Sequence, residues 1–132
     1  MCSSDLSRDN IAAVHHALSR RRLRYTLIHS HGSFLDILPY RASKGKAVRY
    51  LGKKWAIPLT HMITSGDSGN DEAMLRGGFK GIVVGNHAPE MKRLRGLKNL
   101  YFAKNPHTAG ILEGLAHYGL VKIPKKGIQH YE

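Results

Sequence analysis

The residues best suited to chemistry stand in one short acidic segment, Gly66-Asp67-Ser68-Gly69-Asn70-Asp71. It follows an apolar run and precedes a helical pattern. A hard cation such as Mg²⁺ takes oxygen ligands, and it completes its octahedron with water and substrate phosphate. The glycines allow a turn sharp enough to bring Asp67 and Asp71 to one side. The segment therefore predicts a metal site that also binds a phosphate.

The alternative is a plain turn followed by a helix cap, because turns use the same residue types. A turn does not need both acids and an amide directly after a buried strand. The chain has only 9 acidic residues, so their concentration here favours the metal site.

Lys44 is the second candidate, in the segment Ser43-Lys44-Gly45-Lys46. A helix is expected to begin here with Ser43 as its N-cap, and a cation at that end is poorly matched to the helix dipole. Such a lysine suits the neutralisation of a phosphate or carboxylate, and an exposed lysine without a role is the alternative. The chain has no Gly-x-x-x-x-Gly-Lys-Ser/Thr spacing, which excludes a P-loop.

The elements that must position these residues begin with a small α+β unit. The hydrophobic pattern predicts a helix at 9–20 and strands at 23–30 and 34–38, the second strand closed by Pro39. Alternation predicts one half-buried face on the first strand, made of Leu23, Tyr25, Leu27 and His29.

From residue 44 onward, helices and strands alternate. The pattern predicts helix 44–55, strand 61–65, helix 70–75, strand 81–85, helix 88–94, strand 100–103 and helix 107–118. This order indicates an α/β fold with a parallel sheet and helices on its faces. The apolar face of helix 44–55 is expected at Ala47, Val48, Leu51 and Trp55. Ligands bind at the carboxyl ends of such strands, so Asn86 is a candidate substrate contact, with a strand-end turn as the alternative.

The composition excludes several classes of protein. The 132 residues give room for one domain or part of a larger one, and 42% hydrophobic residues suffice for a packed core. The single Cys2 rules out an internal disulfide framework and favours a reducing compartment, which we take to be the cytoplasm. No apolar run approaches the roughly 20 residues of a membrane helix. The net charge is +12, but basic residues are scattered without interleaved aromatics, so we expect no specific nucleic-acid partner.

Several segments together resemble one superfamily. Lys44-Gly45 opening a helix, the acidic segment 66–71 and Val83-Val84-Gly85-Asn86 are similar to haloacid dehalogenase-like (HAD) phosphatases with a C2-type cap. Asp36-Ile37-Leu38-Pro39 and the segment 106–118 resemble the sucrose-phosphate phosphatase branch, at the end of the cap and in the closing helix respectively. This branch includes free phosphatases and phosphatase-like domains of sucrose-phosphate synthases. The resemblance covers residues 9–120.

The resemblance implies a role for each candidate residue. Asp67 would be a direct Mg²⁺ ligand, and Asp71 would hold a metal-bound water and pair with the lysine. Lys44 would neutralise the transferred phosphoryl group and the attacking carboxylate. Ser68 and Asn70 would orient the phosphate side of the loop. In the family an aspartate attacks phosphorus to form an aspartyl-phosphate, and a second aspartate acts as acid and base.

The sequence departs from the family pattern at the nucleophile. The family carries Asp-x-Asp at the end of its first strand, and no Asp-x-Asp occurs in this chain. We therefore expect a C-terminal fragment: cap end at 9–39, second half of a HAD-like (Rossmannoid) parallel-sheet core at 40–120, and basic tail at 121–132. Residues 1–8 do not resemble the family, and Cys-Ser-Ser-Asp-Leu is what a sequencing adaptor would encode. An artefactual start on a fragmentary gene is the hypothesis for this segment.

The expected function is that of a fragment of a Mg²⁺-dependent sugar-phosphate phosphatase, acting on sucrose 6-phosphate in the intact parent. The chain alone is expected to be inactive because it lacks the nucleophile. One alternative is a phosphatase of another sugar phosphate or phosphoglycerate ester. Another is a non-catalytic phosphatase-like domain of a sucrose-phosphate synthase, fused to a glycosyltransferase.

Overall fold

The computed structural model describes residues 8–31 and 33–122, and every structural statement below concerns these residues. The helices are α1 (Arg8–Arg20), α2 (Lys44–Lys54), α3 (Glu72–Leu75) and α4 (His107–His117), with 3₁₀-helices η1 (Leu59–His61), η2 (Gly69–Asp71) and η3 (Pro89–Leu94). The strands are β1 (Tyr25–Ser30), β2 (Phe34–Pro39), β3 (Ile63–Gly66), β4 (Lys80–Val83) and β5 (Leu100–Phe102). In the described part of the chain, no helix is long and apolar enough to cross a membrane. The expected non-family start (1–8) and basic tail (121–132) lie almost wholly outside the described residues.

The chain forms the α+β and α/β units that the sequence predicts. β1 and β2 pair antiparallel, with Tyr25 opposite Pro39 and Ser30 opposite Phe34. β3, β4 and β5 form a separate parallel sheet in that order, with β4 in the centre. The alternation of helix and strand thus predicted the α/β class and the parallel sheet correctly.

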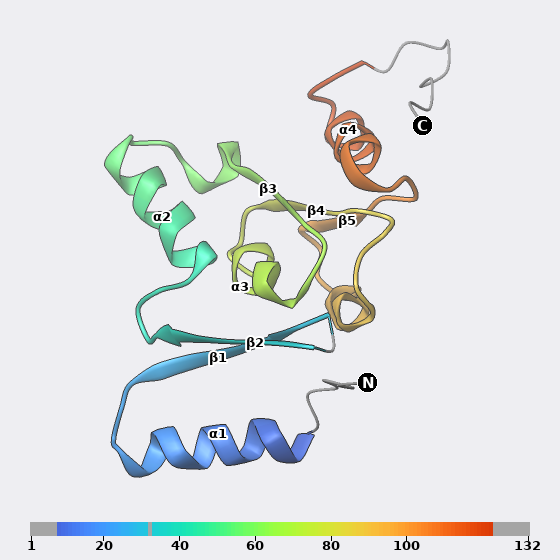
Figure 1. Cartoon of the computed structure of the whole chain (residues 1–132). Helices are drawn as coiled ribbons and strands as arrows, with labels where there is room; N and C mark the ends of the chain where they lie inside the picture. Colours follow the sequence, from blue (N-terminus) through green and yellow to red (C-terminus); the bar gives the residue numbers. More distant parts are fainter. Residues whose placement is uncertain (1–7, 32, 123–132) are drawn as a thin grey trace.

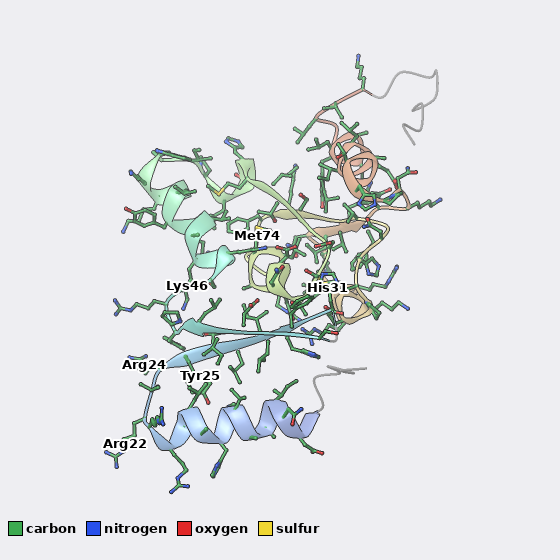
Figure 2. All side chains as sticks on the ribbon, in the orientation of Figure 1. Arg22, Arg24, Tyr25, His31, Lys46 and Met74 are labelled. Carbon is green, nitrogen blue, oxygen red and sulfur yellow. The ribbon has the colours of Figure 1, made fainter. Side chains whose placement is uncertain are left out.

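The β1–β2 hairpin has neighbours on both of its faces. Figure 1 shows α1 along one face and the α/β unit along the other. Tyr25 lies between β1 and α1 (Figure 2), and its hydroxyl donates to the carbonyl oxygen of His15 at 2.9 Å. Residues 25–28 are all half-buried, whereas His29 is exposed and Ser30 is buried. The predicted alternation of buried and exposed residues is therefore wrong, because each face of β1 has its own partner.

Helix α2 packs by a side adjacent to the expected one. Its N-cap is Ser43, as predicted, whose Oγ accepts from the Lys46 N–H at 3.1 Å. Its buried residues are Gly45 and Gly52. A Cβ at Gly45 would lie 2.2 Å from the carbonyl oxygen of Ala73, so α2 rests directly on the backbone of α3.

The predicted apolar face of α2 is mostly uncovered. Ala47, Leu51 and Trp55 are exposed, and only Val48 is half-buried. Trp55 keeps 61% of its surface accessible. The expectation that this face is the packed one is wrong for the described residues, because the two glycines permit a closer approach on the adjacent side.

The parallel sheet is covered on both faces. On one side lie α3 and η3, whose Leu75, Met91 and Leu94 form the core with Val83 of β4, and Leu97, Leu100 and Phe102 pack against it. Helix α4 lies on the other side (Figure 1), where a Cβ at Gly114 would stand 2.5 Å from Ile82 Cγ1. The segment predicted as a short helix at 88–94 is the 3₁₀-helix η3.

Glu113 of α4 fixes the loop that follows β5. Its carboxylate accepts from the backbone N–H groups of Lys104 at 3.0 Å and Asn105 at 2.9 Å, and from the Tyr101 hydroxyl at 2.7 Å. Burial acts to raise the pKa of Glu113, but these hydrogen bonds outweigh it and lower the pKa to about 2. The charged carboxylate therefore ties α4 to the end of β5 and to the loop that follows it.

Candidate active site

The acidic segment leaves the carboxyl end of β3. The chain turns through η2, where Ser68, Gly69 and Asp71 are buried. Gly66 makes this turn possible, because a Cβ there would lie 2.5 Å from the Cβ of Asp71. Both predicted carboxylates thus lie at the end of the sheet that open α/β folds use for ligands.

Asp71 is held from two sides. Lys44 Nζ, from the first turn of α2, donates to Asp71 Oδ1 at 2.5 Å. The Asp67 N–H donates to Asp71 Oδ2 at 3.1 Å. The Asp71 side chain is 9% exposed and that of Lys44 is 51% exposed, so the lysine reaches from the surface to neutralise a buried carboxylate. Hydrogen bonds between charged groups are stronger than neutral ones, which fixes the carboxylate in one orientation.

Asn70 and Ser68 complete this cluster. Lys44 Nζ also donates to Asn70 Oδ1 at 3.2 Å, and the same oxygen accepts from Ser68 Oγ at 3.1 Å. The structure thus brings together residues from two segments that the sequence had singled out separately. It gives them a common hydrogen-bond network, while their chemical roles stay predictions.

Asp67 differs from Asp71 in having a free carboxylate. It is half-buried, and no hydrogen bond or ion pair engages its side chain among the described residues. Its backbone carbonyl accepts from the Ala88 N–H at 2.7 Å, which fixes the loop to the segment after β4. Asp67 and Asp71 both line a cavity of about 340 Å³, whose other residues are Ser65, Gly66, Val84, Asn86, His107, Thr108 and Ile111. Lys44 stands behind Asp71, outside this lining.

These donors fit a Mg²⁺ ion. No three His, Cys, Asp or Glu side chains converge anywhere in the described ranges. Mg²⁺ does not require such a group, because it keeps several waters and binds through one or two carboxylates plus substrate phosphate. The free carboxylate of Asp67 would bind the ion directly, and Asp71, already paired with Lys44, would hold a water of the ion.

Asn86 lines the cavity, and its side chain forms hydrogen bonds with His107. Its Oδ1 accepts from the His107 N–H at 2.8 Å, and its Nδ2 lies 3.2 Å from His107 Nδ1. His107 begins α4 with a φ of 47°, in the left-handed region. Asn86 thus anchors the helix that forms the far wall of the cavity, and its contact with substrate stays a prediction.

Two ionisable residues at this site were missed by the sequence reasoning. His107 and Glu90 both lie beside the acidic loop or its cavity through contacts between distant segments. His107 follows Pro106 at the start of the helix predicted after strand 100–103. This position could have placed it near the carboxyl end of that strand. Glu90 gave no signal, since an acid in the first turn of a helix is ordinary.

The chain has the fold and site of the HAD-like phosphatases. It combines a parallel sheet, an acidic loop after β3 and a lysine at the start of the preceding helix. The sucrose-phosphatase of Synechocystis sp., solved with sucrose and phosphate, has this fold. It matches with a TM-score of 0.77 and 31% identity, over 83% of this chain and 46% of that one. The family model for sucrose-6F-phosphate phosphohydrolase matches residues 2–119, and the chain belongs to this family.

Two further relatives are named for other activities. The mannosylfructose-phosphate phosphatase of Agrobacterium fabrum is 40% identical over 96 residues, which are 71% of this chain and 39% of that protein. The glucosylglycerol-phosphate synthase of Pseudomonas anguilliseptica is 34% identical over 103 residues, 77% of this chain and 13% of that protein. The chain thus spans less than half the length of these relatives.

Proposed function

We propose that this chain supplies the cation-binding and lysine-bearing half of the active site of a Mg²⁺-dependent sugar-phosphate phosphatase. The whole protein would convert sucrose 6-phosphate into sucrose and phosphate. The observation that carries the proposal is the Lys44–Asp71 pair next to the free carboxylate of Asp67, at a cavity at the end of β3. A fixed cation and two carboxylates suit the binding of a phosphoryl group and a divalent ion. Family membership supports a sugar phosphate as the substrate.

Lys44 has one N–H donor available for a hydrogen bond to the substrate. An ammonium group has three N–H donors. Lys44 Nζ gives one to Asp71 and one to Asn70, so the third is free for a phosphoryl oxygen or an attacking carboxylate. Asp71 orients the lysine, and Ser68 and Asn70 hold the phosphate side of the loop. Mg²⁺, when bound, would offset the negative charge that develops on the phosphoryl oxygens.

The covalent step needs groups that this sequence does not contain. An aspartate would attack phosphorus, an O–P bond would form as the ester P–O bond breaks, and an acid would protonate the departing sugar oxygen. Water would then hydrolyse the aspartyl-phosphate. No Asp-x-Asp pair occurs in the chain. We place that pair in a segment upstream of residue 1 in a longer protein, and we expect the chain alone to be inactive.

The test measures phosphate release from sucrose 6-phosphate in the presence of Mg²⁺. The full-length protein, with the genomic sequence upstream of this chain, should hydrolyse the ester, and Asp67→Asn should reduce kcat by at least about a hundredfold. Asp36→Asn, in the hairpin, is the matched control and should retain activity. The 132-residue chain alone should release no phosphate. Release by this chain, lost on Asp67→Asn, would overturn the assignment of the nucleophile to another segment.

The sugar itself is the least constrained part of the proposal. Another sugar phosphate or a phosphoglycerate ester remains the alternative, and the relative named for mannosylfructose phosphate favours the first of these. Comparing kcat/KM of the full-length protein for sucrose 6-phosphate, mannosylfructose phosphate and phosphoglycerate decides among them. We expect the protein in the cytoplasm, because its single cysteine gives no internal disulfide.

A second candidate function is a phosphatase-like domain of a synthase. The match to a glucosylglycerol-phosphate synthase, of which this chain covers 13%, favours a fusion to a glycosyltransferase. In that case the domain would bind a sugar phosphate without hydrolysing it. A glycosyltransferase region upstream in the genomic sequence, together with no Asp-x-Asp motif, would identify this arrangement.

A further inference from the structure

Glu90 joins the hairpin to the acidic loop. It lies in the first turn of η3, and its Oε1 accepts from the His31 N–H at 3.1 Å and from the Gly69 N–H at 3.2 Å. His31 directly follows β1, and Gly69 is the first residue of η2. Figure 2 places His31 beside η3. One carboxylate oxygen therefore holds the two units of the chain together next to the candidate active site.

The backbone contact around this carboxylate is tight. A Cβ at Gly69 would lie 2.3 Å from the carbonyl oxygen of His29, so the end of β1 lies directly against the loop. Gly69 is buried, and Ser30 is only 3% exposed. His31 has a φ of 53°, a left-handed conformation that the surrounding contacts must stabilise. The hairpin cannot move relative to the sheet without disturbing Gly69.

Glu90 is held by backbone amides and not by a basic side chain. No lysine, arginine or histidine of the described residues forms an ion pair with it at 4.0 Å or less. Burial acts to raise the pKa of Glu90. Hydrogen bonds from its own N–H and from those of His31 and Gly69, together with the charge of His31, outweigh burial, so the pKa of Glu90 lies below its ordinary value. The carboxylate is thus charged and committed to these amides.

We propose that Glu90 is a positioning residue that couples the orientation of the hairpin to the shape of the acidic loop. Gly69 stands between Ser68 and Asn70, within the segment that carries Asp67 and Asp71. A change in the hairpin turn is transmitted through His31, Glu90 and Gly69 to that segment. The consequence for catalysis rests on the proposed phosphatase function, whereas the coupling itself does not.

The first test measures amide hydrogen exchange by NMR in the 132-residue chain. Glu90→Ala should accelerate exchange at both His31 and Gly69 by about tenfold or more, because both amides lose their acceptor. Glu90→Gln keeps an acceptor oxygen and should restore both rates to within about threefold of the parent. Lys92→Ala, an exposed residue of the same 3₁₀-helix, is the matched control and should change neither amide.

The amides of β4 serve as an internal reference for global unfolding. Acceleration at His31 and Gly69 with unchanged rates in β4 supports the coupling. Acceleration of only one of the two amides, or equal acceleration throughout β4, overturns it. If Glu90→Ala does not fold, Glu90→Asp, whose carboxylate is one methylene shorter, replaces it: faster exchange at both amides supports the coupling, and parent-like rates at either amide refute it.

The second test uses the full-length protein with sucrose 6-phosphate. Glu90→Ala should lower kcat by about tenfold and leave KM for the sugar phosphate within about threefold, because the acidic loop is displaced while no residue that lines the cavity is removed. Glu90→Gln should recover most of kcat. An unchanged kcat in Glu90→Ala overturns the positioning role. A parent protein without activity on any sugar phosphate refutes the proposed function alone, since the exchange result stands independently.

Discussion

Replacing Gly45 with alanine should separate α2 from α3 and so weaken the site that depends on their contact. The added Cβ would lie 2.2 Å from the Ala73 carbonyl oxygen and 2.7 Å from its carbonyl carbon. Both atoms are backbone, so no side-chain rotation can relieve the overlap. Ordinary van der Waals contact begins at 3.4 Å, so α2 must move by roughly 1 Å. Lys44, the preceding residue, would move with it.

The expected magnitude follows from two opposing effects. Overpacking of a tight contact costs about 1–3 kcal/mol. Alanine is a better helix former than glycine by about 1 kcal/mol, which offsets part of this cost. Because the overlap is with backbone atoms, the overpacking cost should lie in the upper part of its range, about 2–3 kcal/mol, and the free energy of unfolding should fall by about 1–2 kcal/mol. The Lys44–Asp71 ion pair, at 2.5 Å in the parent, should lengthen as well.

Urea denaturation of the 132-residue chain measures this change. Gly96→Ala is the matched control, because no atom lies within 4 Å of a Cβ built there. It should shift the free energy of unfolding by no more than about 0.5 kcal/mol. The reasoning is refuted if Gly45→Ala is as stable as the parent, or if both variants lose equal stability.

Two further predictions concern stability and association. Glu113 has a pKa lowered from 4.5 to about 2, so its stabilisation is complete above pH 4.5 and is lost as the pH falls towards 2. Glu113→Gln should be destabilised by about 1 kcal/mol at pH 7 and should lack that pH dependence in urea titrations; an identical pH profile in both proteins would contradict this. β3 is an edge strand of the parallel sheet, so the chain should self-associate with rising concentration in sedimentation velocity. A single monomeric species with full amide protection along β3 would exclude this association.

The parts of the structure set by local pattern were predictable from the sequence. The acidic segment, the β-branched run of β4 and the Ser43 cap each carry their own signal within a few residues. Their order along the chain then determines the parallel sheet, because a helix between strands returns the chain in the same direction. The cluster of Lys44 with Asp71 follows from that order and from the position of both at the same end of the sheet.

The packing of one element against another was not predictable from the sequence. Periodicity predicted the packed face of α2 wrongly, because Leu51 and Trp55 are exposed and the side that carries Gly45 and Gly52 is buried. An apolar stripe indicates that a helix face prefers burial, but it does not identify the element that packs against that face. The same limit applies to β1, where partners on both faces removed the alternation. Glu90 was missed because its two hydrogen-bond partners lie in other segments.

Described residues of this chain supply several contacts that shape the acidic loop. Gly66 gives Asp71 the space to approach, the Asp67 N–H orients one oxygen of its carboxylate, and Lys44 neutralises the other. None of these contacts requires the proposed upstream segment. A segment carrying the nucleophile would therefore meet a loop that is already formed, and its docking would not have to supply the ordering free energy of that loop. Among the described residues, the Asp67 carboxylate has no hydrogen-bond or ion-pair partner, and Asp67 lines the cavity that we propose for a cation and a phosphate.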